Sequence, residues 1–336
     1  MGFQRKNKKM KNFIFAIAAT AATCFMASTA TAEETRVFDV SLPLGKESHH
    51  AVGVLKFGEE LSRLSNGRLT IRPHYDNALG GEREVVEGIG FGLIDMGISS
   101  TGPMGGFVDE FMLFDLPYIF RTPEQAYGFL DSKYGDQLAK KLEDQVGVKI
   151  LCWMENGYRH NTNNVRPLHT PDDLKGIRHR TQESRVQVDT WTALGADASP
   201  MAWTEVFTAL QQGVIDSQEN PIATIYDVKF YEVQKYLNLT QHVYSPAPFM
   251  MGAKLFNSLS ESDQAIVLQA AKTALTVQRE ASQRMEKELI VKLGELGMVV
   301  TRPDLDAFRE RVQPVISKWK EKVGPELVDA AINFKP

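Results

Sequence analysis

The sequence predicts an α/β protein of two lobes with a long helix that spans both. Three observations lead to this prediction: strand-like and helix-like segments alternate from residue 36, the composition changes near residue 156, and residues 261–293 contain no glycine or proline. The length of 336 residues suits about two domains of roughly 150 residues each. Alternation of this kind is typical of a largely parallel sheet whose strand ends form a crevice for a ligand.

The elements of the first predicted lobe follow from hydrophobic periodicity. A strand over 36–42 precedes a helix over 51–64, in which apolar residues recur at helical spacing, and a strand over 69–73 comes next. The turn at 79–81 opens a helix with three acidic residues in its early turns, where they favour the helix dipole. Residues 95–99 are expected to form the next strand.

A second lobe is predicted to begin after residue 156, where a polar strand over 158–162 follows glycine-rich and aromatic sequence. A strand over 177–181 and helices over 183–194 and 203–212 come next.

The segment 261–293 follows a possible cap at Ser260, and its small and apolar residues recur at helical spacing. At 1.5 Å per residue this helix is about 50 Å long, more than one lobe needs, so we expect it to span both. The predicted division is a signal peptide over 1–32, a first lobe of 33–156 plus about 246–285, and a second lobe of 157–245 plus about 286–336.

The first 32 residues are expected to form a signal peptide that is cleaved after Ala32. A basic start precedes an apolar run over 13–26, which is too short for a permanent membrane anchor, and Ala30-Thr31-Ala32 supplies a small-residue cleavage pattern. This segment holds five of the 38 basic residues and none of the 42 acidic ones, so the mature chain carries a net charge of −9. We therefore expect a periplasmic protein, and the acidic charge argues against nucleic acid or an anionic membrane as a partner.

Most chemistry-bearing motifs are absent. The seven histidines include no HExxH or HxH pattern, and neither a GxGxxG nor a GxxxxGK[ST] loop occurs, so we expect no metal and no cofactor. No Gly-x-Ser-x-Gly elbow is present. Cys152 is the one cysteine left after cleavage, and its apolar neighbours indicate a core position and not a nucleophile.

Two arginines in strand-like segments, Arg159 and Arg180, are the strongest candidate ligand groups. Arginine suits a sheet interior poorly unless an anion compensates its charge, and its planar fork matches a carboxylate with two hydrogen bonds. The alternative for either residue is a solvated or salt-bridged side chain.

Several long, ordered motifs resemble the solute-binding subunits of TRAP transporters, the DctP-type family. The resemblance runs from about residue 36 to the C-terminus. The motifs are Leu79-Gly-Gly-Glu82 with Asp95-Met-Gly97, Asn156-Gly-Tyr-Arg159, Leu174-Lys-Gly-Ile-Arg-His-Arg180, the run from Trp203 to Pro221 that ends in Gln218-Glu-Asn-Pro221, and Lys229 to Tyr236.

This resemblance implies a two-lobed periplasmic-binding-protein fold, type II-like in its TRAP variety, that closes on an organic acid and is not an enzyme. The implied partners are a small organic acid anion and the TRAP membrane permease, and a monomer is the usual state. Arg180 matches the arginine that grips the ligand carboxylate, Arg159 a second pocket arginine, and Asn220 a side chain that orients the same carboxylate. Other positions that commonly face the ligand are Glu82, Ser100, Glu183 and Trp203, with His50 as a further candidate.

For each of these further positions a structural role is the alternative. Trp203 would then be a core aromatic residue and Glu82 a helix-start acid, whereas His50, Ser100 and Glu183 would be surface residues. The chain also departs from the family, with Thr181-Gln182 in place of Val-Pro after the clamp arginine.

The polar candidates favour a hydroxylated acid, such as a sugar acid, over a plain monocarboxylate. An exported enzyme acting on an organic acid in the same crevice is the rival function, and a subunit that presents the acid to a sensor uses the same pocket.

Overall fold

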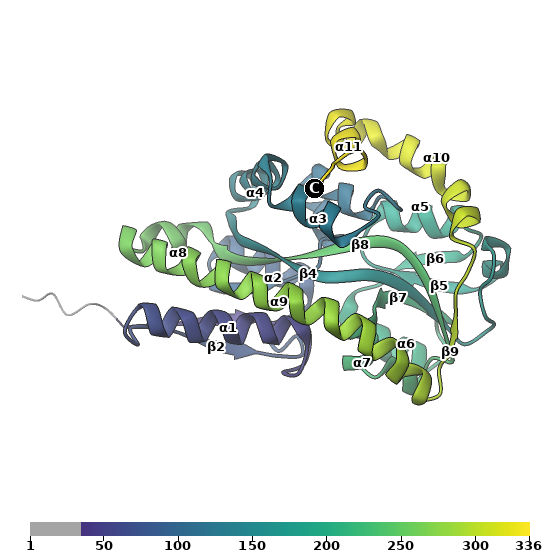
Figure 1. Ribbon diagram of the computed structural model, residues 1–336, viewed down its shortest axis with the longest axis horizontal. Helices are drawn as coiled ribbons and strands as arrows, with labels where there is room; N and C mark the ends of the chain where they lie inside the picture. The colour runs from purple at the N-terminus through teal and green to yellow at the C-terminus, as the bar shows by residue number, and fades with distance from the viewer. Residues whose placement is uncertain (1–34) are drawn as a thin grey trace, which may run out of the picture. The chain divides into compact units, whose positions relative to one another are not determined.

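A single mixed sheet organises the part of the chain that the structure describes, residues 35–336 of this computed structural model (Figure 1). The predicted signal peptide and its cleavage site lie outside the described residues. The strand order is β2-β1-β3-β8-β4-β7-β5-β6, with β9 paired to β8. The strands are β1 (Arg36–Ser41), β2 (Leu69–His74), β3 (Met96–Ile98), β4 (Val148–Asn163), β5 (Arg178–Thr181), β6 (Asp197–Pro200), β7 (Ser217–Pro221), β8 (Tyr236–Gly252) and β9 (Val299–Thr301).

The two flanks of the sheet are parallel and its centre is antiparallel. On one flank β1 pairs in parallel with both β2 and β3, and on the other β5 pairs in parallel with both β6 and β7. Between the flanks, the long strands β4 and β8 pair antiparallel to each other. The pairs β8–β3 and β4–β7, which join them to the flanks, are antiparallel as well. The expectation of a largely parallel sheet was therefore wrong at the centre, because it did not include these two long strands.

The helices surround this sheet and supply its cores. Five short 3₁₀ segments also occur in the described chain. The α-helices are α1 (His49–Leu64), α2 (Glu82–Phe91), α3 (Pro123–Leu130), α4 (Lys133–Val146), α5 (Arg185–Ala193), α6 (Val206–Gln211), α7 (Ile222–Asp227), α8 (Ala253–Ser258), α9 (Glu261–Glu295), α10 (Leu305–Val323) and α11 (Pro325–Ile332). The 3₁₀ segments are η1 (Gly102–Gly106), η2 (Asp109–Asp115), η3 (Pro171–Leu174), η4 (Trp203–Glu205) and η5 (Phe230–Glu232).

The long helix is confirmed: α9 spans 35 residues, and the Ser260 hydroxyl caps it by accepting a hydrogen bond from Asp263 N at 3.1 Å. Figure 1 shows α9 crossing in front of β4 and β8, from α1 at one end to α7 and β9 at the other. Its first half packs with α1 and β1 around Val267 and Ala270, whereas Leu293 near its end belongs to a separate core with α6 and α7. One helix thus contacts the cores of both flanks of the sheet.

Four apolar clusters fill the space between the sheet and the helices. Two lie on the β1 flank, one beneath α1 and one that joins α2, η2, α3 and α4. The other two lie on the β5 flank, beneath α6 and α7 and beneath α5. The end of α10 and all of α11 pack with the α2 cluster through Trp319 and Val328. The division into two lobes at the stated boundaries stays a prediction.

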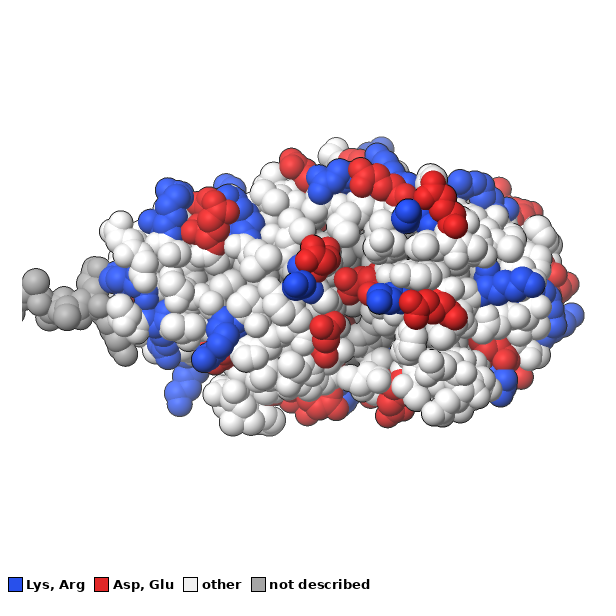
Figure 2. Space-filling view, turned by 90° about the horizontal axis from the view of Figure 1, so that it is seen from below, with Lys and Arg blue, Asp and Glu red and all other residues white. Residues whose placement is uncertain are grey.

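The remaining features concern the described helices, one face of the surface and the cysteine. Within residues 35–336, no helix is long and apolar enough to cross a bilayer. On the face drawn in Figure 2, basic and acidic side chains are scattered, with wide uncharged areas between them. Cys152 is a free, buried thiol, and burial raises its pKa to about 12, so it is a core residue as predicted.

Candidate ligand-binding site

A small cavity lies where the strands of both flanks end. In open α/β sheets the carboxyl ends of parallel strands form the ligand crevice. Residues from both flanks and from the central strand β4 line it. They are Pro43 and Leu44 after β1, His50 in α1, Glu82 in α2, Ser100 after β3, Asn156 and Arg159 in β4, Gln182 after β5, Trp203 after β6, Asn220 in β7 and Thr224 in α7.

A bulge in β4 directs Asn156 into this cavity. The pairing register with β8 shifts between Glu155 and Gly157, which leaves Asn156 between two paired residues. Gly157 has φ +119°, a conformation that side-chain-bearing residues rarely adopt, and a Cβ there would lie 3.3 Å from Pro221 Cβ. Glu155 bonds instead to α9, where its amide donates to Gln278 Oε1 at 2.8 Å.

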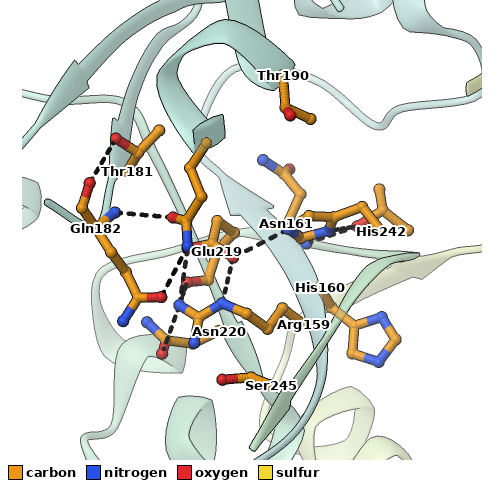
Figure 3. Close-up of polar contacts among 12 residues, drawn as sticks. Arg159, His160, Asn161, Thr181, Gln182, Thr190, Glu219, Asn220, His242 and Ser245 are labelled. Atoms are coloured by element: carbon orange, nitrogen blue, oxygen red, sulfur yellow. Dashed lines mark hydrogen bonds and ion pairs between the residues drawn. The ribbon is translucent and has the colours of Figure 1, made fainter. Parts of the chain in front are cut away.

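Arg159 is buried in an ion pair with Glu219. Its Nε donates to Glu219 Oε2 at 2.5 Å and its Nη2 to Oε1 at 2.7 Å, and Nη2 also lies 3.2 Å from Asn220 Oδ1 (Figure 3). His242 Nε2 lies 3.0 Å from Glu219 Oε2. Burial alone would raise the pKa of Glu219, but the charge of Arg159 and the bonds from His242 and Arg159 hold it well below its usual value. The Arg159 charge is therefore balanced within the protein.

Arg180 is buried without such a partner. Its Nε and Nη2 both donate to the Met201 carbonyl, at 2.9 and 2.7 Å, and within residues 35–336 it forms no ion pair. Its guanidinium carbon lies 6.0 Å from the centre of the Trp203 ring, one wall of the cavity. Burial lowers the pKa of Arg180 to about 10, so the group is still charged at neutral pH.

Both arginines keep one buried nitrogen, Nη1, with no hydrogen-bond partner in the described structure. Arg159 is 1% and Arg180 2% exposed, so water does not compensate these donors freely. A buried donor of a charged group that has no hydrogen-bond acceptor costs roughly several kcal/mol of free energy, and a ligand that supplies an acceptor removes this cost. An anion with two acceptor oxygens, such as a carboxylate, is the ligand that this pair of donors favours.

Other lining residues offer acceptors and neutral groups. The Glu82 carboxylate accepts a hydrogen bond from Ser100 N at 2.6 Å at the start of α2. Both ring nitrogens of His50 are buried with no hydrogen-bond partner among residues 35–336, and burial holds its pKa well below the usual value, so the ring is neutral with one donor and one acceptor. The hydroxyl of Thr224 is likewise unpaired. Such groups suit the hydroxyls of a ligand.

Six of the eight residues predicted from the sequence line the cavity: His50, Glu82, Ser100, Arg159, Trp203 and Asn220. Arg180 lies behind Trp203, and Glu183 is exposed and does not line the cavity, although its charge acts on Arg180. The roles of all eight in binding stay predictions.

The sequence analysis missed five cavity residues and the counter-ion Glu219. Gln182, Pro43 and Leu44 lie within three residues after the end of a strand, as Ser100 does, so the strand-end rule alone would have found them. Asn156 belongs to a quoted motif, and Thr224 follows the Gln-Glu-Asn-Pro motif by three residues.

Asp115, behind the cavity, is expected to make stability depend on pH. Its Oδ1 accepts from Gln187 Nε2 at 2.8 Å, and its Oδ2 is buried with no hydrogen-bond partner in the described part of the chain. Burial raises the Asp115 pKa to about 7. Because this pKa exceeds the unfolded value, the folded state binds the extra proton, and stability falls as pH rises from about 4 to about 7. Asp115→Asn should reduce the Tm difference between pH 5.5 and pH 8 by about 2–4 °C in calorimetric scans. An unchanged difference would contradict the assignment.

Known proteins resemble this chain over nearly all of its described length. The model of the family described as bacterial extracellular solute-binding protein, family 7 (DctP), matches residues 41–322. A 2,3-diketo-L-gulonate-binding periplasmic protein from Escherichia coli strain K12 is 33% identical over 304 residues, which cover 90% of this chain and 91% of the relative.

Two solved structures have the same fold. A TRAP periplasmic solute-binding protein from Polaromonas sp. JS666, bound to D-erythronate, matches with a TM-score of 0.87 at 38% identity and covers 90% of this chain and 100% of its own. A sugar acid binding protein from Advenella mimigardefordensis, in complex with galactonate, matches with a TM-score of 0.87 at 33% identity, over 89% of this chain and 97% of its own.

Proposed function

The chain belongs to the DctP family of TRAP periplasmic solute-binding proteins, and from this we propose that it captures a sugar acid by closing two lobes around it and delivers it to a TRAP permease. The family is not enzymatic, so the exported-enzyme alternative is set aside. Export after cleavage at Ala32 and a monomeric state are part of the same proposal.

The observation that carries the proposal is the pair of unpartnered guanidinium nitrogens on Arg159 and Arg180. Glu219 pairs with Arg159, whereas Arg180 forms no ion pair within residues 35–336 and feels the charges of Glu219, Glu82 and Glu183 only from a distance. A ligand carboxylate supplies the missing negative charge and the two acceptors. Because the whole mature chain is acidic, this local charge and not the overall field attracts the anion.

Hydroxylation of the ligand is supported by the other cavity groups. Glu82 accepts hydrogen bonds, and His50 and Thr224 have buried polar atoms that lack partners. A plain monocarboxylate would leave these groups unpaired, whereas the hydroxyls of an aldonate or uronate would bond to them. The bound D-erythronate and galactonate of two similar structures are acids of this class.

Lobe closure is supported by hydrogen bonds between segments that we assign to different lobes. Gly45 N donates to Asp227 Oδ2 at 2.9 Å, Gln182 Nε2 to Ser100 Oγ at 2.7 Å and Trp203 Nε1 to the Pro43 carbonyl at 3.4 Å. We therefore assign this arrangement to the closed form, in which both walls reach the ligand at once.

A thermal-shift screen of the mature protein against aldonates, uronates and unhydroxylated acids tests the function. A ligand that binds only the native state raises the Tm. We expect at least one sugar acid to raise it by several degrees and butyrate to have little effect. A shift produced by another ligand class and by no acid would refute the proposal.

Glu82→Gln should weaken sugar acid binding selectively. The amide keeps the shape of the side chain but loses the charge that strengthens its hydrogen bonds to ligand hydroxyls. We expect D-erythronate to bind about tenfold more weakly in isothermal titration calorimetry, which corresponds to about 1.4 kcal/mol. Butyrate is the control: its affinity should stay the same or rise, since a negative charge has left the cavity. A loss shared equally by both acids would place Glu82 near the carboxylate instead.

A further inference from the structure

Gln182 closes one wall of the cavity by bridging its two sides. Its side chain is buried, and its Nε2 donates to Ser100 Oγ at 2.7 Å. Ser100 follows β3 and Gln182 follows β5, so the bridge joins the two parallel flanks of the sheet. The bridge lies beside Glu82, because the same Ser100 donates its backbone N–H to Glu82 Oε1. It therefore stands at the side of the cavity where we place the ligand hydroxyls.

The Gln182 amide is held in place by a second glutamine. The backbone N–H of Gln182 donates to Gln187 Oε1 at 3.1 Å, and the side-chain Nε2 of Gln187 donates to Gln182 Oε1 at 2.9 Å. Gln182 is labelled in Figure 3. Gln187 is itself anchored on Asp115 Oδ1. Both ends of the Gln182 amide thus have protein partners, which distinguishes it from the unpaired groups of His50 in the same cavity.

Gly102 provides the room for this arrangement. A Cβ at Gly102 would lie 2.6 Å from Gln182 Oε1 and 2.7 Å from its Cδ, so only glycine allows the amide to sit there. The amide consequently has one position, fixed by Ser100, Gln187 and the Gly102 backbone. A group that is held by partners at both its nitrogen and its oxygen acts as a boundary of the cavity more than as a ligand contact.

We propose that Gln182 is a specificity-determining residue that limits the length of the acid that the cavity accepts. This inference rests on the proposed function. With the carboxylate held at the arginines, a longer polyol chain extends toward the Ser100–Gln182 bridge and meets the amide. Behind the amide lie the polar groups of Gln187 and Asp115, which would bond to further hydroxyls if the bridge were removed.

Gln182→Ala tests this by removing the amide and the methylene that carries it, space for about one or two hydroxymethylene units. Calorimetric titration with D-erythronate, a four-carbon acid, and galactonate, a six-carbon acid, gives a Kd ratio for each variant. We expect the ratio to shift at least tenfold toward galactonate, about 1.4 kcal/mol. Gln187 does not line the cavity but holds the Gln182 amide in place. Gln187→Ala should therefore shift the Kd ratio in the same direction as Gln182→Ala, and by less.

Gln211→Ala is the matched control, because it removes the same side chain from an exposed position at the end of α6 and should leave the ratio unchanged. Equal weakening of both acids by Gln182→Ala would overturn the inference and make Gln182 an ordinary ligand contact. An equal shift in Gln211→Ala would overturn it too. If the native protein binds both acids in an Arg180-dependent way and the ratio does not move, only this inference fails. If no acid of the thermal-shift screen binds, the proposed function fails as well.

Discussion

Arg180→Ala is expected to weaken sugar acid binding by at least roughly 10–10²-fold. A charge-assisted hydrogen bond contributes about 1.5–3 kcal/mol, and Arg180 keeps one unpartnered nitrogen, Nη1, for the carboxylate. Arg180→Lys should also bind poorly, at least about tenfold more weakly than the native protein, because an ammonium group keeps the charge but not the planar fork. Isothermal titration calorimetry with D-erythronate or the best acid from the screen measures both losses.

Arg185→Ala is the control for this prediction. Arg185 is exposed in the first turn of α5, five residues along the chain from Arg180, and its removal should leave the affinity unchanged. Folding is followed by the Tm of the ligand-free variants. Native affinity in Arg180→Ala would show that the carboxylate is held elsewhere.

Glu219→Gln is expected to destabilise the protein by about 3 kcal/mol, since removal of one partner leaves the buried Arg159 charge uncompensated. The depressed pKa of Glu219 fixes the pH range: its contribution is present above the ordinary carboxyl pKa and is lost as pH falls below it. The loss of stability should therefore be full at pH 7 and smaller near pH 3. Urea unfolding at the two pH values measures it.

A double substitution separates the charge effect from a packing defect. Arg159→Met with Glu219→Leu removes both charges at similar volume and should recover most of the stability, while acid binding stays weak. Asp306→Asn, in the exposed pair with Arg309, is the control and should cost less than about 1 kcal/mol. If Glu219→Gln were as harmless as Asp306→Asn, the buried pair would not be a structural requirement.

Local signals were enough to predict the regular elements of the fold. The helical spacing of Val54, Phe57 and Leu61 predicted α1. The stretch 261–293, which contains no glycine or proline, predicted α9 to within two residues of its observed end. Both helices have one buried stripe, which is the pattern that periodicity detects. The turn before Glu82 and the strand that ends before Ser100 were located in the same way, and both residues line the cavity.

The centre of the sheet was beyond this reasoning. β4 and β8 are buried along most of their length and bend at three shifts of register, so their side chains show no simple alternation. Only residues 158–162 of β4 were assigned to a strand, and the antiparallel pairing was not anticipated. The Glu219 partner of Arg159 is 60 residues distant in the chain, and only the β4–β7 pairing brings the two together.

The central claim is that buried guanidinium groups hold the carboxylate of the ligand. Its most direct test compares one sugar acid with its own primary amide, such as galactonate with galactonamide, by calorimetric titration of the native protein at pH 7. The two compounds share every hydroxyl and differ only in the charged end. We predict that the acid binds and that the amide binds at least about 10²-fold more weakly, since it brings no charge to Arg180. Equal affinity for the two compounds would contradict the account.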